Sequence, residues 1–277
     1  MRIRATVAAV AGALALSALA LPTAQAAESS GTPYTLNVSF SNLTIAKAIK
    51  VGTTNKVSTK YTYTLTHGAD VNVKASDFFT DAFLYKGTYG ADTTPELFGD
   101  NPASCTTVTA TTETCTGTID IYPADGDLKS AWAGTWSVAA EAVAFNGQNQ
   151  SNPDLSKVGY NDKAGFGTTL VQRYDKLTAN ASPEPVKKGA TITVTGSLTR
   201  ANWDDHLYHG VSGVSVKLQF AKAGTSTYTT VKTITTSSTG ALKTTVTASV
   251  DGYYRYSFAG SPSTPAINSA GDYIDVQ

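Results

Sequence analysis

One short stretch near the middle of the second half of this chain concentrates residues that can do chemistry. It holds two carboxylates and two imidazoles within six positions, with two aromatic rings beside them: Trp203, Asp204, Asp205, His206, Tyr208 and His209. Carboxylate oxygens and imidazole nitrogens that converge from one loop can ligate a transition metal. Aromatic rings offer faces for stacking against a ligand. Because of these residues, we predict the stretch as a binding surface. The alternative is a solvated loop whose rings cover the end of a core.

A second acidic group suits calcium, which prefers oxygen ligands. Asp120, Asp125 and Asp127 are closely spaced, and Gly126 permits a sharp turn between the last two. A complete EF-hand loop is absent, because Trp136 stands at the twelfth position counted from Asp125. These three aspartates are the predicted metal ligands, and an ordinary turn with solvated carboxylates is the alternative.

Catalysis finds little support in the sequence, and no catalytic residue is predicted. The chain has only three histidines, and it lacks a Gly-x-Ser-x-Gly elbow, a His-Glu-x-x-His motif, a phosphate loop and a dinucleotide fingerprint. Carbohydrate binding is a further possibility, since exposed aromatic rings such as those of Trp132 and Trp203 can stack on sugars. We therefore predict a protein that is not an enzyme and requires no cofactor, with calcium as the alternative ligand.

The two cysteines, Cys105 and Cys115, are predicted to form a disulfide. The sequence contains no Cys-x-x-Cys motif and no basic neighbour that would lower a thiol pKa, which argues against a redox role. Strand-like segments on either side, joined by a threonine-rich turn, indicate that the bond closes a hairpin. A loop of about ten residues gives on the order of 3 kcal/mol of stability in the chain-entropy model.

The N-terminus reads as a secretory signal. Arg2 and Arg4 precede an apolar stretch that ends in Ala24-Gln25-Ala26, so cleavage is expected after Ala26. An N-terminal membrane anchor is the alternative. Removal of residues 1–26 leaves 19 basic against 21 acidic side chains, a formal net charge of −2. Such a balance gives no global attraction for nucleic acid. The expected location is therefore extracellular, without membrane insertion, and an exported chain keeps a disulfide oxidised.

Apolar and polar residues alternate with a period of two along much of the chain, which predicts half-buried antiparallel strands. In residues 190–200, for example, Ile192, Val194 and Leu198 alternate with threonines and serine. The predicted fold is all-β, with two tandem immunoglobulin-like β-sandwiches at residues 34–174 and 176–277. The first is expected to contain a strand at residues 71–75 and a long loop at residues 146–163.

Several of these segments carry a resemblance to a known group of proteins. Residues 190–200, 216–220, 228–233 and 252–260 resemble the C-terminal immunoglobulin-like domain of secreted two-domain actinobacterial proteins. The hairpin between Cys105 and Cys115 and the sequence Gly134-Thr135-Trp136 resemble the N-terminal domain of the same proteins. The likeness implies the two-domain architecture, and because some of these proteins carry a calcium-binding label, it also implies calcium as a ligand.

The sequence thus predicts an exported, non-enzymatic binding or structural protein that contacts a cell-surface or extracellular component. The partner is expected to be an extracellular protein or a polysaccharide. A calcium-binding protein and a carbohydrate-binding module are the two alternatives.

Overall fold

The structure is a computed structural model that describes residues 31–91 and 94–277. This part of the chain contains twenty β-strands and three short 3-10 turns, so the predicted all-β fold class is confirmed. Within the same residues, no helix has the length and apolar character needed to cross a membrane. The predicted signal at residues 1–26 lies outside the described residues.

The chain divides into two compact units. The first comprises the described residues up to Ile49, together with Lys56–Ile121 and Thr135–Thr169. The second comprises Lys50–Asn55, Tyr122–Gly134 and Leu170–Gln277. This division assigns to the second unit two loops that lie within the predicted N-terminal sandwich.

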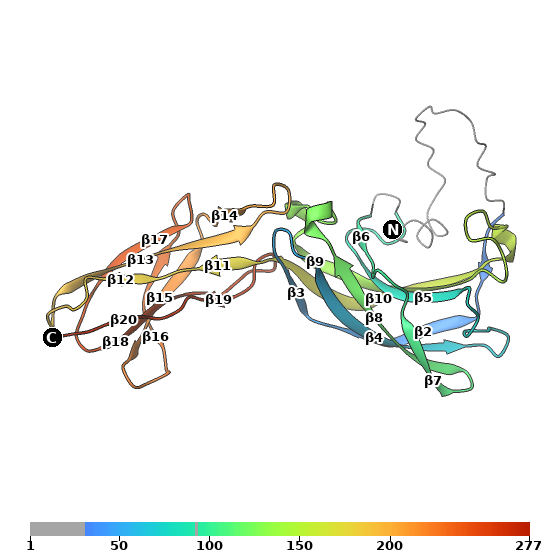
Figure 1. Cartoon of the computed structure of the whole chain (residues 1–277), viewed down its shortest axis with the longest axis horizontal. Coiled ribbons are helices and arrows are strands. Elements are labelled where there is room, and N and C mark those ends of the chain that lie inside the picture. The colour runs from blue at the N-terminus through green and yellow to red at the C-terminus, as the bar shows by residue number, and fades with distance from the viewer. Residues whose placement is uncertain (1–30, 92–93) are drawn as a thin grey trace, which may run out of the picture. The chain divides into compact units, whose positions relative to one another are not determined.

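The first unit is a sandwich of two sheets with the strand order of an immunoglobulin domain (Figure 1). One sheet runs β2-β4-β8-β7 and the other β10-β9-β5-β6, which correspond to the A-B-E-D and G-F-C-C′ orders. The strands are β1 (Tyr34–Thr35), β2 (Val38–Ile45), β3 (Ala48–Val51), β4 (Val57–His67), β5 (Phe78–Tyr85), β6 (Glu96–Leu97), β7 (Ser104–Thr109), β8 (Thr112–Ile121), β9 (Gly134–Ala144) and β10 (Gly159–Arg173). The short strands β1 and β3 both pair with β10.

Apolar residues that alternate with polar residues along the strands form the core of this sandwich. On β4, Tyr61, Tyr63 and Leu65 are buried while the intervening residues are polar, and Ile119 and Ile121 of the neighbouring β8 are fully buried. Full burial of a large apolar side chain contributes roughly 1.5–3 kcal/mol. Strand β9 departs from this pattern, since every residue in its second half is buried, on both faces of the sheet. The outer face of sheet β10-β9-β5-β6 therefore carries a second set of buried side chains.

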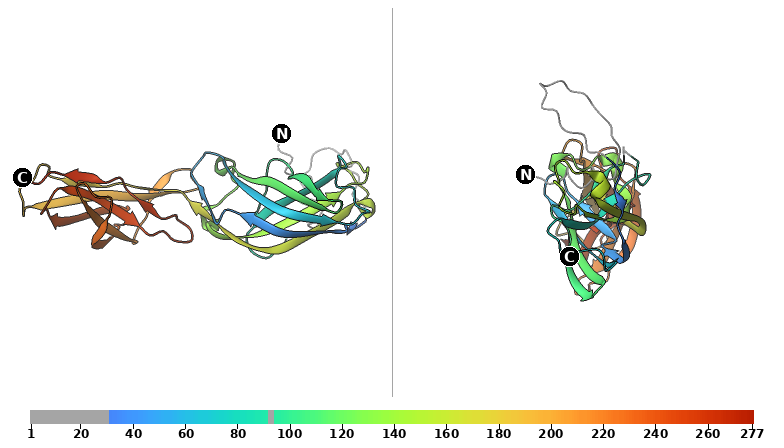
Figure 2. Two further views of the ribbon diagram at one scale, coloured as in Figure 1. Left: turned by 90° about the horizontal axis from the view of Figure 1, so that it is seen from below. Right: turned by 90° about the vertical axis from the view of Figure 1, so that its right-hand side faces the viewer.

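The second unit is also an immunoglobulin-like sandwich (Figure 2). One sheet is built on β13 and the other on β15 and β18, giving A-B-E and G-F-C-C′ arrangements. Its strands are β11 (Asp175–Leu177), β12 (Asn180–Ser182), β13 (Thr191–Ala201), β14 (Tyr208–Gly210), β15 (Ser215–Lys222), β16 (Thr229–Thr235), β17 (Ala241–Thr247), β18 (Gly252–Phe258), β19 (Ile267–Asn268) and β20 (Asp272–Ile274). Ile192, Val194 and Leu198 are fully buried, as their alternation predicts. The Tyr256 hydroxyl crosses the core and donates to the Val194 carbonyl at 2.8 Å.

The predicted strand at residues 71–75 is wrong, because this segment forms turns. The Val71 and Ala75 N–H groups donate to the carbonyls of Gly68 and Asn72. The Asn72 side chain also accepts from the Lys74 N–H at 3.1 Å. An asparagine that bonds its own following backbone competes with a sheet ladder and favours a turn.

The predicted loop at residues 146–163 is only partly correct, since β10 already begins at Gly159 and the turn η4 spans Leu155–Lys157. Glycine and asparagine have low strand propensity, which hid this segment from sequence reasoning. The Asn161 side chain secures the strand by donating to the carbonyls of Leu36 and Val38 at 3.0 and 2.9 Å. Gly159 is required there, because a Cβ would collide with the side chains of Leu36 and Tyr34.

Candidate binding face of the first sandwich

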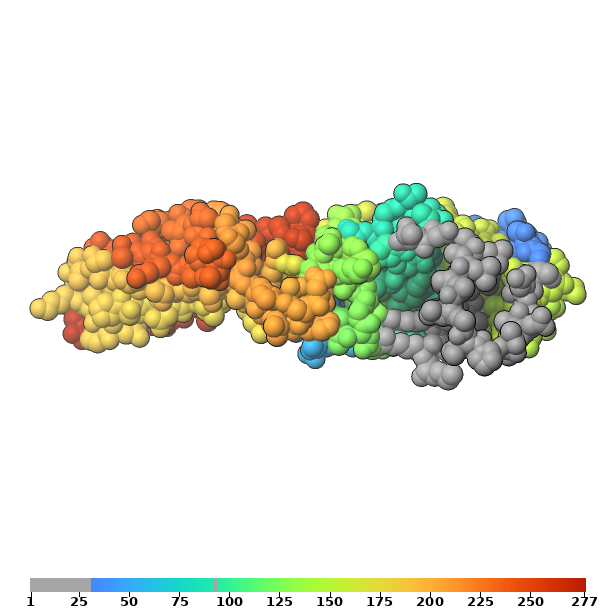
Figure 3. All heavy atoms as spheres, turned by 90° about the horizontal axis from the view of Figure 1, so that it is seen from above, coloured from blue at the N-terminus to red at the C-terminus, as the bar shows by residue number. Residues whose placement is uncertain are grey.

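The outer face of sheet β10-β9-β5-β6 combines carboxylates with aromatic rings. We call it the acid–aromatic face and define it by Asp81, Phe83 and Tyr85 of β5, Tyr89, Glu96 and Phe98 of the following segment, Ala139 and Glu141 of β9, and Tyr160, Asp162 and Ala164 of β10. On β5 these residues alternate with Thr80, Ala82 and Leu84, which lie on the opposite face of the strand. Figure 3 shows the segment that follows β5, in teal, at the surface of the first unit.

Glu141 lies at the centre of this face and is only 3% exposed. It is directly opposite Asp81 in the antiparallel pairing of β5 with β9, which places the two Cβ atoms about 5 Å apart. The Tyr160 hydroxyl donates to Glu141 Oε2 at 2.9 Å. Glu141 Oε1 is buried and has no hydrogen-bond partner. A buried acceptor without a donor costs about 1–3 kcal/mol, so this oxygen calls for an explanation.

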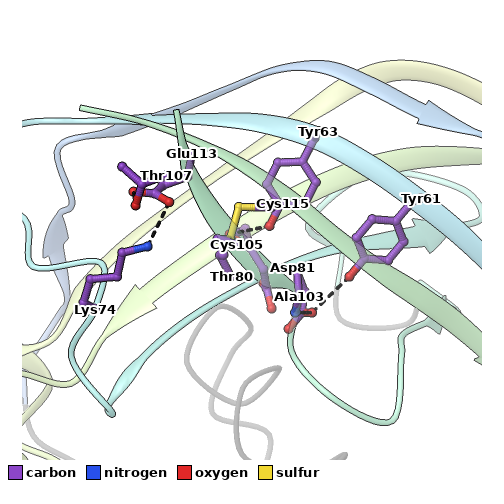
Figure 4. The surroundings of a disulfide bond; sticks show 11 residues. Tyr61, Tyr63, Lys74, Thr80, Asp81, Ala103, Cys105, Thr107, Glu113 and Cys115 are labelled. Atoms are coloured by element: carbon purple, nitrogen blue, oxygen red, sulfur yellow. Dashed lines mark hydrogen bonds and ion pairs between the residues drawn. A yellow bond between two sulfur atoms is a disulfide. The ribbon is translucent and has the colours of Figure 1, made fainter. Parts of the chain in front are cut away.

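Strand β6 pairs only with Leu84 and Tyr85 of β5. It therefore leaves the edge of β5 uncovered at Asp81. The Ala103 N–H donates to Asp81 Oδ1 at 2.9 Å, and the Tyr61 hydroxyl donates to the same oxygen at 3.1 Å (Figure 4). Tyr61 reaches it by passing over Gly117 of β8, where a Cβ would overlap the tyrosine ring. The core of the sandwich thus orients Asp81.

Burial perturbs both carboxyl groups. It raises the pKa of Glu141 to about 8, against the hydrogen bond from Tyr160 and with the help of the negative charges on Asp81, Glu96 and Asp162. It also raises the pKa of Asp81 to about 7, against the hydrogen bonds from Tyr61 and the Ala103 N–H. An acid whose pKa is raised by folding binds more protons in the folded state. The stability that these two groups contribute is therefore fully present below the ordinary carboxyl pKa and is lost as the pH rises through about 7 for Asp81 and about 8 for Glu141.

Aromatic rings surround the carboxylates. Phe83 stacks on Phe98 with the ring centroids 4.7 Å apart, and Tyr85 and Tyr89 meet edge to face at 5.0 Å. The Tyr89 hydroxyl donates a short hydrogen bond to Asp162. Burial first, and then the interaction with Asp162, raises the pKa of Tyr89. These contacts hold the rings and one carboxylate in a defined arrangement.

No cation of the described chain pairs with this face. Lys56 instead pairs with Asp100 and Asp120, and Lys74 pairs with Glu113. Asp81, Glu96, Glu141 and Asp162 make no ion pair within the described residues. Among the described residues the face is therefore acidic and aromatic, with no cation paired to its carboxylates, and this combination attracts organic cations and hydrogen-bond donors.

The predicted disulfide between Cys105 and Cys115 is confirmed, and it joins directly opposite residues of β7 and β8. Beside it, Glu113 is 1% exposed and is held by Lys74 Nζ at 2.9 Å and by the Thr107 hydroxyl at 3.0 Å (Figure 4). The bond closes a hairpin next to a satisfied buried charge, which is a structural arrangement.

The three predicted calcium ligands are distributed over both units. Asp120 of the first unit binds Lys56 at 2.9 Å and accepts from the Asp100 N–H. Burial acts to raise its pKa, but these bonds and those from Ser58 and Thr118 outweigh it and lower the pKa to about 2. In the second unit, Asp125 ends the turn η2 (Pro123–Asp125), and Asp127 accepts from the Tyr122 N–H at 2.7 Å. Residues 31–91 and 94–277 contain no group of three His, Cys, Asp or Glu side chains placed to hold a metal ion.

The prediction that Trp203 offers an exposed ring is wrong, because its side chain is 1% exposed in the second unit. Its indole N–H donates to the carbonyls of Gly52 at 3.0 Å and Val51 at 3.3 Å. Its backbone N–H donates to the Ser130 hydroxyl at 2.9 Å. Trp203 thus joins two loops to the second sandwich. Ser130 belongs to the turn η3 (Ser130–Trp132), whose Trp132 is half-buried with Lys129 Nζ 5.2 Å from its ring.

The rest of the predicted binding stretch lies near the surface. Asp204 accepts from the Ser130 N–H at 3.3 Å, and Asp205 pairs with His209 at 2.6 Å. Tyr208 is covered by Lys176, whose Nζ lies 3.8 Å from the ring centroid. His206 has a left-handed backbone, with φ of 61°, and its Nδ1 is buried without a partner. The structure brings Asp205 and His209 together but assembles no wider set of ligands from this loop.

Sequence reasoning missed the acid–aromatic face, although a signal was present. Glu141 interrupts the apolar run of β9, and Asp81 does the same between Phe79 and Phe83 of β5. A lone carboxylate inside an otherwise buried strand is rarely buried without a function or a partner. Two such residues in adjacent strands would have marked the face.

Comparison with known proteins identifies no relative by sequence. No protein-family profile and no curated protein matches the chain. Among solved structures, the Yersinia pseudotuberculosis adhesin InvE is similar over 86% of this chain and 60% of its own, with 15% identity and a TM-score of 0.26. The Escherichia coli adhesin FdeC is similar over 89% and 66%, with 12% identity and a TM-score of 0.31. The titin I-band fragment I67–I69 is similar over 84% and 65%, with 12% identity and a TM-score of 0.27. The chain therefore spans less than two thirds of the length of each of these structures.

Proposed function

We propose that this protein is an exported, non-enzymatic binding or structural protein that contacts a cell-surface or extracellular component. The observation that carries the proposal is the acid–aromatic face, where acceptors and aromatic rings gather on the outside of a rigid sheet. Sites on sheets are held more precisely than sites on loops, because packing fixes their rotamers. The predicted signal at residues 1–26 and the disulfide hairpin support an oxidising, extracellular location.

The same face contains a carboxylate pair, Asp81 and Glu141, which in a glycosidase would act as acid and base. Both side chains are buried here, at 8% and 3% exposure. Asp81 is occupied by two donors from its own chain. The geometry therefore favours holding a ligand group over transforming a substrate.

Retention measurements test this function. Purified protein is applied to intact cells and to insoluble extracellular polymers, including chitin, cellulose, peptidoglycan and collagen, and the bound fraction is measured against concentration. We expect saturable retention on at least one material and no turnover of chromogenic glycosides or esters. Absence of retention on every material, or turnover that Glu141→Gln abolishes, would overturn the proposal.

The carbohydrate-binding alternative is separated by the same assay. Its aromatic candidates are reduced to half-buried rings such as Trp132, since Trp203 is fully buried. Retention confined to polysaccharides and lowered by Trp132→Ala would favour that alternative. Retention that Trp132→Ala leaves unchanged would reject it for this residue.

A further inference from the structure

The unpaired acceptor on the acid–aromatic face indicates which chemical group the face is built to hold. This inference rests on the proposed function and specifies its ligand. Glu141 Oε1 is buried, has no donor, and belongs to a side chain that is 3% exposed. Its second oxygen is already bonded to Tyr160. A group that completes the site must therefore supply a donor to Oε1.

The charge of the surroundings narrows the choice of donor. Asp81 of β5, Asp162 of β10 and Glu96 of β6 all place negative charge near Glu141. The other titratable groups that act on Glu141 are Tyr160, Tyr89 and, from β4, Tyr63, which are hydroxyl groups and not cations. A neutral hydroxyl would donate to Oε1 but would leave the repulsion between the carboxylates. A cation that carries N–H groups would donate to Oε1 and would also offset this repulsion.

The aromatic rings distinguish an organic cation from a metal ion. Phe83, Tyr85, Tyr89 and Phe98 supply ring faces and edges, which attract ammonium groups and pack against alkyl chains. The chain uses this chemistry elsewhere, for example where Lys176 lies over Tyr208. The described residues contain no group of three His, Cys, Asp or Glu side chains that could hold a metal ion.

The burial of Glu141 determines which kind of ammonium group can reach it. Tyr89, Phe98, Tyr160 and Asp162 are partly exposed, whereas Glu141, which is bonded to Tyr160, is buried. An amine attached directly to a sugar ring cannot reach such an acceptor without burying the ring. A four-carbon alkyl stem carries its ammonium past the rings while its methylenes contact them.

We propose that the acid–aromatic face binds the side-chain ammonium of a lysine presented by a partner protein, with Glu141 Oε1 as the acceptor. Tyr160 positions the carboxylate, and Asp81, Asp162 and Glu96 supply the surrounding negative charge. The aromatic rings contact the alkyl stem of the lysine.

Calorimetric titration of the full chain with four probes at pH 8 tests this proposal. The probes are Nα-acetyl-lysine methylamide, its Nε-acetylated form, spermidine and glucosamine. We expect the lysine probe to bind, the acetylated form to lose at least tenfold in affinity, and glucosamine to be equally weak. The affinity for the lysine probe should rise at least threefold between pH 6 and pH 8, because Glu141 must lose a proton to hold a cation.

Two variants keep the test independent of folding defects. Glu141→Gln should lower the affinity at least tenfold, and Glu96→Gln, at an exposed position, should lower it about twofold to fivefold without altering the melting curve. Equal affinity for the acetylated probe, or binding unchanged in both variants, would overturn the proposal. Tighter binding of spermidine than of the lysine probe would assign the face to a free polyamine and reject a partner lysine.

The outcome is separable from that of the proposed function. If the protein is retained on extracellular material and Glu141→Gln leaves this retention intact, the lysine site is wrong and the binding function stands. If the lysine probe binds but no extracellular material retains the protein, the ligand site stands and the proposed function fails.

Discussion

Replacement of Trp203 is the sharpest stability test of this structure. The indole is 1% exposed and donates to the loop Lys50–Asn55, and the Trp203 backbone N–H donates to Ser130 in the loop Tyr122–Gly134 of the same unit. Truncation of a buried tryptophan to alanine costs about 3–5 kcal/mol from lost transfer energy and the cavity that remains. Loss of the indole N–H also leaves the Gly52 carbonyl without its donor. We therefore expect Trp203→Ala to destabilise the second unit by about 4 kcal/mol.

A graded series separates packing from hydrogen bonding. Trp203→Phe keeps most of the apolar contact and removes the donor, so it should cost about 1–2 kcal/mol. Leu207→Ala in the same loop is the matched control, because Leu207 is 60% exposed and its loss should change stability by no more than about 0.5 kcal/mol. At roughly 4 °C per kcal/mol, Trp203→Ala should lower the melting transition of the second unit by about 15 °C.

Calorimetric melts and urea titrations measure these differences, with a separate transition assigned to each unit where the two are resolved. A Trp203→Ala protein within 1 kcal/mol of the unmodified protein would refute the burial argument. So would equal costs for Trp203→Ala and Leu207→Ala. In either case the ring would lie in solvent, and its prediction as a binding residue would regain force.

Three further predictions concern titration, the disulfide and calcium. Glu141→Gln removes the carboxyl group whose pKa burial raises, so it should flatten the loss of stability between about pH 5 and pH 8 and stabilise the first unit at pH 9 by roughly 2–4 kcal/mol. The free energy of unfolding, measured by urea titration at each pH, checks this. Parallel curves of this free energy against pH for the variant and the unmodified protein would contradict it. Replacing both Cys105 and Cys115 with alanine should cost about 3 kcal/mol, as expected for a closed loop with a separation of 10 residues, and a reducing agent should lower the stability of the unmodified protein equally. Millimolar CaCl2 should raise the melting temperature if Asp125 and Asp127 bind calcium, and a chelator should reverse the rise; a melt that calcium leaves unchanged would end the calcium hypothesis.

Local pattern alone determined most of the strands. Alternation in residues 190–200 predicted the buried set Ile192, Val194 and Leu198, because side chains in a strand point to opposite faces at every step. The spacing of Cys105 and Cys115 and their strand-like flanks likewise predicted the hairpin disulfide. These features depend on residues that are close in sequence, so the sequence contains the information in readable form.

Tertiary structure alone decided which of the chemically capable residues meet. Trp203 is buried and hydrogen-bonded to Ser130 and Gly52, which lie 73 and 151 positions away in the chain. Burial raises the pKa of Glu141, and the negative charge of Asp81, placed opposite it by strand pairing, adds to that rise. Burial and charge coupling arise from contacts between distant segments. The alternation of side chains along a strand predicts which face of the sheet a side chain lies on, but it does not predict what covers that face.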